Sequence, residues 1–232
     1  MNRKLDKVWY LKQINLFSRM DEREIHALAE RTTMREVSRG KVILGPDEQP
    51  GMVYLIKEGR VKVSRYSADG REQILALLEP GDLFGDLSLV GKGEPVHMEA
   101  FEDSLICTLQ RGDFIELIRN QPELMLHVMR VLAERLRQTE EEIADLVFRT
   151  VPARLASLLL RLAETYGETN GRGMRLSLRL THHDFASMIG ATRETVTSTL
   201  SDFRDDGLID VDQRHIVIRN PEGLRLRSRK ES

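Results

Sequence analysis

Residues 181–206 read THHDFASMIGATRETVTSTLSDFRDD, and this stretch decides the fold of the C-terminal part of the chain. Thr181 followed three residues later by Asp184 is a typical helix start, because both side chains can cap free backbone amides. The first helix ends at Gly190, a residue suited to a helix C-terminus. Thr192 then caps a second helix. This order of signals predicts a helix-turn-helix rather than an ordinary helical hairpin.

The apolar residues of the same stretch support this interpretation. Ala186 is small, as it must be where two helices cross closely. The expected shared apolar side of the two helices consists of Phe185, Ile189, Val196 and Leu200. Two strands, 207–211 and 214–218, are expected to follow, with Asp212-Gln213 between them. A helix-turn-helix followed by a hairpin is a winged helix.

The exposed start of the second helix carries side chains that can read DNA bases. Arg193 can donate two hydrogen bonds to guanine, and Glu194 can accept one from cytosine. Thr197 and Ser198 lie one turn further along the helix. The run 182–184, His-His-Asp, could suggest a metal site, but adjacent helical residues do not face one ligand. A polar patch that faces phosphate is the favoured interpretation of that run.

Residues 37–110 read as a series of short strands. Apolar or alternating runs cover 52–56, 60–66, 73–78 and 104–109, with glycine-containing turns between them. Asp69-Gly70 between two of these runs predicts a tight hairpin. Many short strands at regular spacing indicate a sandwich or a jelly-roll barrel. A short amphipathic helix is expected before them, at 21–31.

Residues 122–148 predict one long helix, with Pro122 in its first turn. Thr150-Val151-Pro152 interrupts the helical run. Apolar positions alternate in steps of four and three, which is typical of a helix that pairs with another helix. We favour a parallel homodimeric coiled coil over a helix packed on its own domain. The predicted dimer seam is Met125, Met129, Leu132, Leu136, Thr139, Ile143 and Leu146. An apolar-rich helix at 153–167 and a glycine-rich turn at 167–173 are expected next.

Composition limits the class of protein. The 232 residues include 41% hydrophobic residues, enough for one or two domains with a core. No apolar run approaches the roughly 20 residues of a membrane helix, and no signal peptide is visible, so no membrane partner is expected. The single cysteine, Cys107, suits a reducing cytoplasm and excludes a multi-cysteine zinc or iron–sulfur site.

The net charge of −2 is unusual for a nucleic-acid binder, which is commonly basic. The charge is unevenly placed, because residues 1–149 carry −4 by count and residues 150–232 carry +2. An acidic first part therefore offsets a slightly basic second part. A charge of +2 predicts weak non-specific binding and a heavier reliance on base contacts and on paired half-sites.

Along almost its whole length the sequence resembles the cyclic-AMP receptor protein / fumarate-nitrate regulator (Crp/Fnr) family of bacterial transcription factors. The resemblance rests on LEPGDLFGDLSL (78–89), LVFRTVPARLASLLLRLA (146–163) and ATRETVTSTL (191–200) with GLI behind it. It implies an α+β fold with three parts. These are a jelly-roll, cyclic-nucleotide-binding-like sensor domain over 1–121, a dimerisation helix and hinge over 122–149, and a winged helix-turn-helix DNA-binding domain over 150–232.

The resemblance also implies a function. Members of the family are homodimers that read palindromic promoter sites in double-stranded DNA and bind a ligand or cofactor in the barrel. By resemblance, Arg193 and Glu194 would read bases, and Thr181 and His183 would approach phosphates. Ser198 stands where many relatives have a second arginine, so one base position should be read less strictly. The loop 167–173 would contact RNA polymerase by the same analogy.

The effector-pocket candidates implied by the resemblance are Gly85, Asp86, Leu87, Val96, His97 and Thr139. Family members that bind cyclic AMP have Gly-Glu-Leu and, some ten residues later, Arg-Ser. Here Gly85-Asp86-Leu87 stands in the first place and Val96-His97 in the second. Valine cannot neutralise a cyclic phosphate, and losing an arginine–phosphate pair costs on the order of a few kcal/mol. We therefore expect cyclic AMP to bind weakly or not at all.

Other cofactors find little support in the sequence. The N-terminal cysteine cluster of the iron–sulfur branch is absent, and no residue points to haem. The barrel either senses another small molecule or has lost sensing. Two further classes stay open: a cupin-like enzyme, for which residues 37–110 supply only His97 as a histidine ligand, and a nucleotide-responsive module that binds no DNA.

Overall fold

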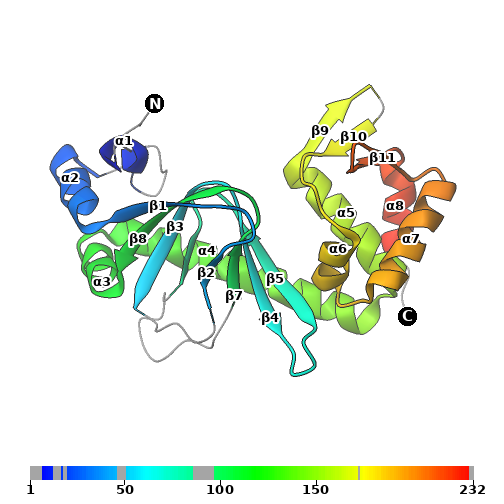
Figure 1. Ribbon diagram of the computed structural model, residues 1–232, viewed down its shortest axis with the longest axis horizontal. Coiled ribbons are helices and arrows are strands. Elements are labelled where there is room, and N and C mark those ends of the chain that lie inside the picture. The colour runs from blue at the N-terminus through cyan, green and yellow to red at the C-terminus, as the bar shows by residue number, and fades with distance from the viewer. Residues whose placement is uncertain are drawn as a thin grey trace. The chain divides into compact units, whose positions relative to one another are not determined.

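The computed structural model describes residues 7–12, 17, 20–45, 51–85, 97–171 and 173–229. The chain divides into two compact units (Figure 1). The first unit comprises residues 1–67 and 74–134, and the second comprises residues 68–73 and 135–232. The division falls within one long helix, α4 (Pro122–Phe148), whose bounds are those that the sequence predicts.

The first unit contains two four-stranded sheets. One has the order β1 (Thr33–Val37), β8 (Ser104–Gln110), β3 (Met52–Glu58), β6 (Leu83–Gly85). The other has the order β2 (Val42–Leu44), β7 (His97–Ala100), β4 (Val61–Tyr66), β5 (Glu72–Leu78). The strand pairs whose register is described are antiparallel. The expected strand-rich block is confirmed, although it begins earlier, with β1 at Thr33.

Strand β3 explains why the run MVYLI is apolar without interruption. Successive side chains of a strand point to opposite faces. Tyr54 and Ile56 pack into a core formed by residues of both sheets. Val53 and Leu55 pack on the other face, in a second core that includes residues of the helices. Both faces of β3 are therefore buried, which removes the polar alternation of a half-exposed strand.

Three short helices cover this second core: α1 (Lys7–Lys12), α2 (Glu22–Arg31) and α3 (Arg111–Asn120). Helix α2 begins at the predicted place. The Asp21 carboxylate accepts a 2.8 Å hydrogen bond from the backbone N–H of Glu24, and the Glu24 carboxylate accepts a 2.8 Å bond from the backbone N–H of Asp21. Helices α1 and α3 are not foreseen from the sequence. Phe114 and Ile118, four residues apart on α3, are its buried residues.

The second unit surrounds α5 (Val151–Tyr166), which Thr150 caps. A sheet of order β11 (Ile209–Asp212), β12 (His215–Ile218), β10 (Gly173–Leu176), β9 (Gly167–Asn170) accompanies three further helices. These are α6 (His182–Ile189), α7 (Arg193–Asp205) and α8 (Pro221–Ser228). The predicted α+β class is confirmed.

Two local expectations in this unit are wrong. The segment 167–173 is not only a glycine-rich turn, because β9 and β10 pair as an antiparallel hairpin and β10 also pairs with β12. The turn of the second hairpin is Gln213-Arg214, not Asp212-Gln213, because Asp212 pairs with His215 across the ladder. Gln213 and Arg214 have φ values of 48° and 67°. This left-handed conformation is uncommon for glutamine and arginine, so the residue types do not predict it.

Candidate nucleic-acid interface

Helix α6 begins with the capping arrangement that the sequence predicts. The backbone N–H of Asp184 donates to Thr181 Oγ1 at 3.1 Å, and the Thr181 backbone N–H donates to Asp184 Oδ2 at 2.7 Å. The Thr181 hydroxyl also donates to Asp184 Oδ2, at 2.7 Å. The proton of that hydroxyl is therefore used inside the helix cap. In this arrangement Thr181 has no hydroxyl proton left for a phosphate, and its predicted phosphate contact stays a prediction.

The turn between α6 and α7 depends on Gly190. Its φ of 61° and ψ of 48° are left-handed, and its backbone N–H donates to the carbonyl of Ala186. A Cβ at this position would lie 3.1 Å from Leu146 Cδ2 of α4, within the same unit. Glycine satisfies both the backbone conformation and the close approach. The shared apolar side is also as predicted, since Phe185, Ile189, Val196 and Leu200 are all buried.

The opposite side of α7 is polar and exposed. Thr192 begins the helix by accepting a 3.2 Å hydrogen bond from the backbone of Thr195. Within the described residues, the side chains of Arg193, Glu194 and Ser198 form no hydrogen bond or ion pair. Their donors and acceptors are thus available to base edges, and Arg193 and Glu194 carry the groups that suit guanine and cytosine.

The other two predicted contact residues already have partners inside the second unit. Thr197 Oγ1 donates to the carbonyl of Arg193 at 2.8 Å and lies 2.8 Å from His182 Nδ1. The exposed His183 has its Nε2 3.4 Å from Glu72 Oε2. The sequence does not reveal the contacts of Thr197 with His182 and of His183 with Glu72, because each joins residues from different elements.

The hairpin β11–β12 is braced from both sides. The guanidinium of Arg219 donates to Asp210 at 3.0 Å. Arg175 Nη2 lies 2.8 Å from Nδ1 of the buried His215. Because a guanidinium only donates, Nδ1 is the acceptor in this contact, and the same Arg175 nitrogen lies 3.4 Å from Nε2. The carbonyl of Gln213, 3.1 Å from Nδ1, then receives no hydrogen bond from it.

Helix α4 carries a long exposed apolar face. Leu124 is its one buried residue among those described. Thr139 is exposed too, and its hydroxyl donates to the carbonyl of Arg135 at 2.9 Å. The remaining predicted seam residues are each between 38% and 61% exposed in the single chain: Met125, Met129, Leu132, Leu136, Ile143 and Leu146. The structure thus brings the seam residues together on one helix, and the described residues cover their apolar side chains only in part.

The last turns of α4 are held to α5 by charge. Arg161 lies 3.8 Å from Glu142 and 3.9 Å from Asp145, and Arg149 lies 3.1 Å from Asp145. Burial raises the pKa of Glu142, and the guanidinium of Arg161 opposes that rise. This cluster fixes the path of the chain from α4 into α5, where sequence analysis predicted only an interruption of the helix.

Three of the six predicted effector-pocket residues are described: Gly85, His97 and Thr139. Gly85 ends β6 with a φ of 91°, and a Cβ there would lie 2.6 Å from the carbonyl of Met52. His97 pairs with Ser64 and meets the ring of Tyr66 edge-on at 5.3 Å. Its neighbour Met98 packs between the two sheets, so His97 faces away from that core. Asp86, Leu87 and Val96 lie outside the described residues.

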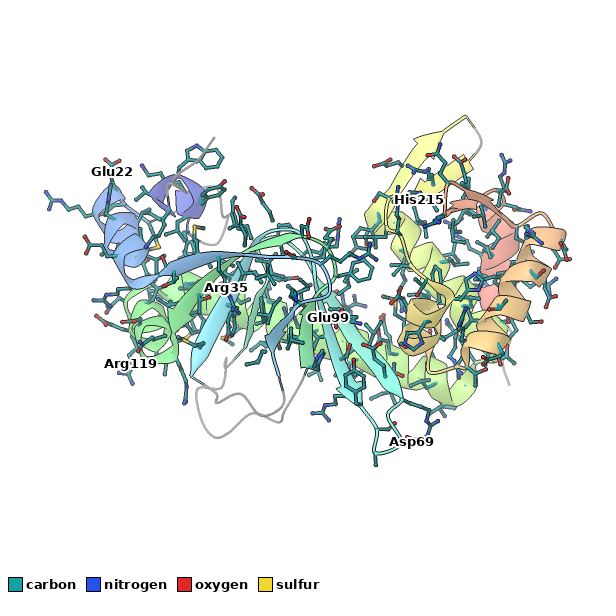
Figure 2. The ribbon with its side chains drawn as sticks, viewed as in Figure 1. Glu22, Arg35, Asp69, Glu99, Arg119 and His215 are labelled. Carbon is teal, nitrogen blue, oxygen red and sulfur yellow. The ribbon has the colours of Figure 1, made fainter. Side chains whose placement is uncertain are left out.

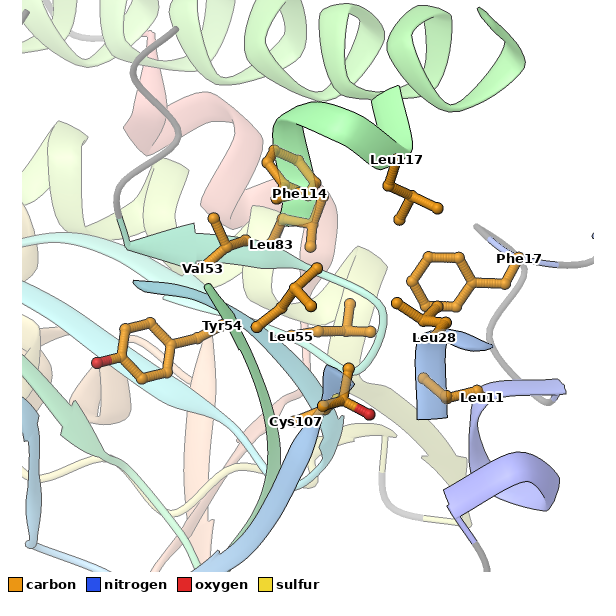
Figure 3. Close-up of a pocket in the computed structure, with 12 residues that line it drawn as sticks. Leu11, Phe17, Leu28, Val53, Tyr54, Leu55, Leu83, Cys107, Phe114 and Leu117 are labelled. Atoms are coloured by element: carbon orange, nitrogen blue, oxygen red, sulfur yellow. The ribbon is translucent and has the colours of Figure 1, made fainter. Parts of the chain in front are cut away.

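A small cavity of the first unit lies between α3 and the sheet that contains β3 and β8 (Figure 3). Its lining is almost entirely apolar, with Cys107 among the lining residues and Phe114 and Leu117 above it. It has room for about one water molecule, too little for a nucleotide-sized effector. Burial raises the pKa of Cys107 to about 11, so its thiol is neutral and poorly reactive.

The part of the chain that the structure describes contains no group of three or more histidine, cysteine, aspartate or glutamate side chains that could hold a metal ion. No helix there has the length and apolar content needed to cross a bilayer.

Known protein families match both units. Residues 153–227 match the Crp-like helix-turn-helix domain, and residues 34–121 match the cyclic nucleotide-binding domain. A CRP-like cAMP-activated global transcriptional regulator of Mycobacterium tuberculosis is 33% identical over 220 residues, which cover 94% of this chain and 98% of that protein. The chain belongs to the Crp/Fnr family of transcription regulators.

Other Crp/Fnr proteins give the same result. The global nitrogen regulator of Synechocystis is 34% identical over 80% of this chain and 84% of its own. The solved structure of FixK2 from Bradyrhizobium japonicum superimposes with a TM-score of 0.74 at 26% identity, covering 87% of this chain and 99% of that one. A CooA variant from Carboxydothermus hydrogenoformans gives a TM-score of 0.76 at 28% identity, over 87% and 90%.

Family membership decides the broad function. This chain is a transcription regulator that binds DNA through its helix-turn-helix, and it is not an enzyme. The helix-turn-helix is α6, Gly190 and α7, whose exposed side chains are shown among the sticks of Figure 2. The cupin-like alternative and the alternative of a module that binds no DNA are thereby set aside.

Proposed function

We propose that the regulator acts as a homodimer that reads a palindromic promoter site, with one α7 in each half-site. The observation that carries this proposal is the uncovered apolar face of α4. Leu136 and Met129 expose 61% and 59% of their surface in the single chain, at heptad positions. A contiguous apolar stripe of this kind marks an interaction surface. A second copy of the same helix, presenting the same stripe, covers it in full.

A two-fold dimer imposes a geometric condition on the DNA. Two recognition helices can enter the major groove on one side of the duplex only when their half-sites are separated by about one helical turn, roughly 34 Å. Each subunit then supplies Arg193 and Glu194 to equivalent bases. The modest charge of residues 150–232, +2 by count, makes the doubling of contacts important, because non-specific phosphate attraction contributes little.

Footprinting tests this proposal with the full-length chain. We expect a protected, palindromic site with two half-sites about ten base pairs apart, and a dimer by analytical ultracentrifugation. A protected site with a single, unpaired half-site would contradict the palindrome. A protein that stays monomeric at micromolar concentration while protecting the full site would contradict the dimer.

We further propose that the effector of this regulator is not cyclic AMP, or that the dimer is competent without a ligand. The support is chemical, because valine at position 96 cannot neutralise a cyclic phosphate. His97, which follows it, faces away from the core between the two sheets. A ligand that does bind the barrel would act by favouring one of two dimer arrangements, and its maximal effect is set by its differential affinity for them.

The M. tuberculosis relative is named as cAMP-activated, so cyclic AMP is the first ligand to test. We expect isothermal titration calorimetry to show no binding of cyclic AMP at physiological, micromolar concentration. Mass spectrometry of small molecules released from the purified protein, with DNA binding measured before and after stripping, tests for another effector. Tight binding of cyclic AMP together with a gain in DNA affinity would overturn the proposal.

RNA polymerase is the remaining proposed partner. The hairpin β9–β10 is the segment at the position where relatives carry a polymerase-contacting loop, by the family resemblance. The side chains of Glu168 and Thr169 are exposed on it. We expect a Glu168→Ala, Thr169→Ala double variant to keep its DNA affinity and to lose transcription activation in a purified system. Unchanged activation would remove this hairpin from the polymerase contact.

A further inference from the structure

A hydrogen bond links the two helices of the helix-turn-helix on their exposed side. Nδ1 of His182, the first residue of α6, lies 2.8 Å from Oγ1 of Thr197 on α7. The same oxygen lies 2.8 Å from the carbonyl of Arg193, one turn back along α7. His182, Arg193 and Thr197 are all exposed. The hydroxyl of Thr197 thus has two partners although it lies on the surface that faces DNA.

Counting protons assigns the direction of both bonds. A threonine hydroxyl has one proton to donate, and a carbonyl oxygen can only accept. The bond to the Arg193 carbonyl therefore uses the Thr197 proton. His182 must then donate to Thr197 from Nδ1, which makes Nδ1 the protonated nitrogen of the ring. No other assignment satisfies both contacts.

This assignment limits what Thr197 can offer to a base. Its hydroxyl has no proton left, so it cannot donate to thymine O4 or to guanine O6. The group that remains for base contact is the γ-methyl, and thymine carries its own C5-methyl in the major groove. Ser198 differs, because its hydroxyl has no partner within the described ranges and keeps a proton for a base.

We propose that Thr197 selects thymine at one position of each half-site through its methyl group, and that His182 is the positioning residue that holds it in this orientation. The proposal rests on the proposed function, because it requires α7 to enter the major groove. His182 acts through Thr197 and needs no contact with a base. One position of the half-site is then read by shape and apolar contact, beside the hydrogen-bonded positions read by Arg193 and Glu194.

The test exchanges thymine for uracil, which differs only by the C5-methyl group. Each thymine of the footprinted site is replaced singly with deoxyuridine, and the affinity of the full-length protein is measured by fluorescence anisotropy. At one thymine per half-site we expect about a fourfold loss, which corresponds to the ~0.8 kcal/mol of burying one methyl-sized group. The other thymines should tolerate the exchange.

Variants assign the effect to the two residues. Thr197→Val keeps the methyl group and should keep the fourfold ratio, whereas Thr197→Ser lacks it and should bring the ratio close to one. His182→Ala should lower the ratio by freeing the hydroxyl to rotate. His182→Asn should restore it, because asparagine carries an N–H donor at the same distance along the side chain as histidine Nδ1. A loss of stability alone would change affinity for both duplexes and leave the ratio unaltered.

The results separate this inference from the proposed function. A wild-type protein that protects no palindrome defeats the proposed function. A protected palindrome whose thymines all tolerate uracil defeats only the reading by Thr197. A thymine-to-uracil ratio that Thr197→Ser leaves unchanged assigns the methyl contact to another residue, and a ratio that His182→Ala leaves unchanged removes His182 from the positioning role. Circular dichroism melts confirm that each variant is folded.

Discussion

Helices α4 and α7 each leave one face uncovered in the single chain, and the two faces differ in chemistry. The face of α4 is apolar, with Met129, Leu136 and Ile143 each more than half exposed. The face of α7 is polar, and the side chains of Arg193, Glu194 and Ser198 on it have no hydrogen-bond or ion-pair partner among the described residues. An exposed apolar stripe is stabilised by a partner surface that excludes water from it. Free hydrogen-bond donors and acceptors are instead satisfied by a partner that presents matching polar groups. The contrast supports the proposals that α4 binds a protein partner and that α7 contacts DNA.

The largest expected effect comes from making the apolar face charged. Leu136→Glu removes an interface leucine from each subunit, worth about 1.5–3 kcal/mol apiece, and adds a buried charge. We expect the dimer dissociation constant to rise about 100-fold or more, measured by analytical ultracentrifugation. Affinity for the palindrome should fall with it.

Ala144→Glu is the matched control for that change. Ala144 is exposed on the same helix but lies off the seam, so the same new charge should leave the dimer intact. If Ala144→Glu dissociated the dimer as strongly as Leu136→Glu, the seam would lie elsewhere on α4.

The second prediction removes a donor from the polar face. Arg193→Ala should weaken binding to the specific site by about 1–3 kcal/mol and relax the preference at one base, because the arginine's two hydrogen bonds to guanine are lost. Fluorescence anisotropy with specific and random duplexes measures both quantities. Arg204→Ala, at the other end of α7, should weaken binding to both duplexes alike. Unchanged specificity in Arg193→Ala would remove Arg193 from base reading.

The third prediction concerns the place where α4 and the turn before α7 meet within the second unit. Gly190→Ala forces a left-handed alanine, at roughly 1–2 kcal/mol, and brings its Cβ to 3.1 Å from Leu146 Cδ2. Gly207→Ala has a similar φ, +70°, but open space around it. Urea unfolding should show a larger loss of stability for Gly190→Ala. Equal losses of stability in the two variants would mean that the Leu146 side chain moves aside from the new Cβ at no cost. It would then also be free to pack against a dimer partner.

The smallest expected effect concerns the buried thiol of Cys107, which lies on neither of the two faces. The pKa of the buried Cys107 thiol is raised to about 11, above the ordinary value of 9.0, so folding favours its neutral form. Its contribution to stability is full below pH 9 and declines as the pH rises through about 11. We expect a thiol reagent at pH 8 to modify Cys107 only in denaturant. Rapid labelling of the folded protein would contradict the burial.

The sequence predicts most of the fold because its signals are local. Pro122 and Pro152 bracket α4, and Thr181, Gly190 and Thr192 place both helices of the helix-turn-helix to within a residue. Helix α3 is missed because its buried residues, Phe114 and Ile118, are too few to show a period. The hairpin β9–β10 is missed because its glycines suggest a turn, whereas its two strands pair with each other and β10 also pairs with β12, which is distant in the sequence.

The site is only partly predictable for a related reason. The residue types at Arg193 and Glu194 suggest base reading directly, since each has a matching base. The contact between His182 and Thr197, and the loss of the Thr197 hydroxyl as a donor, cannot be read from the sequence, because they depend on two side chains fifteen residues apart meeting at 2.8 Å. The capping bonds of Thr181 follow from its helix position, and they also engage its hydroxyl proton, while its contact with phosphate stays a prediction.

The tip of the β11–β12 hairpin has a consequence for engineering. A two-residue turn with both φ values positive is commonly built from Asn-Gly, which adopts that conformation with little strain. This chain uses Gln213 and Arg214 instead, each held in a conformation that L-residues avoid by roughly 1–2 kcal/mol. Anyone adapting the winged helix as a heat-resistant DNA-binding module would find a ready gain in stability at these two positions, at the loss of one surface cation.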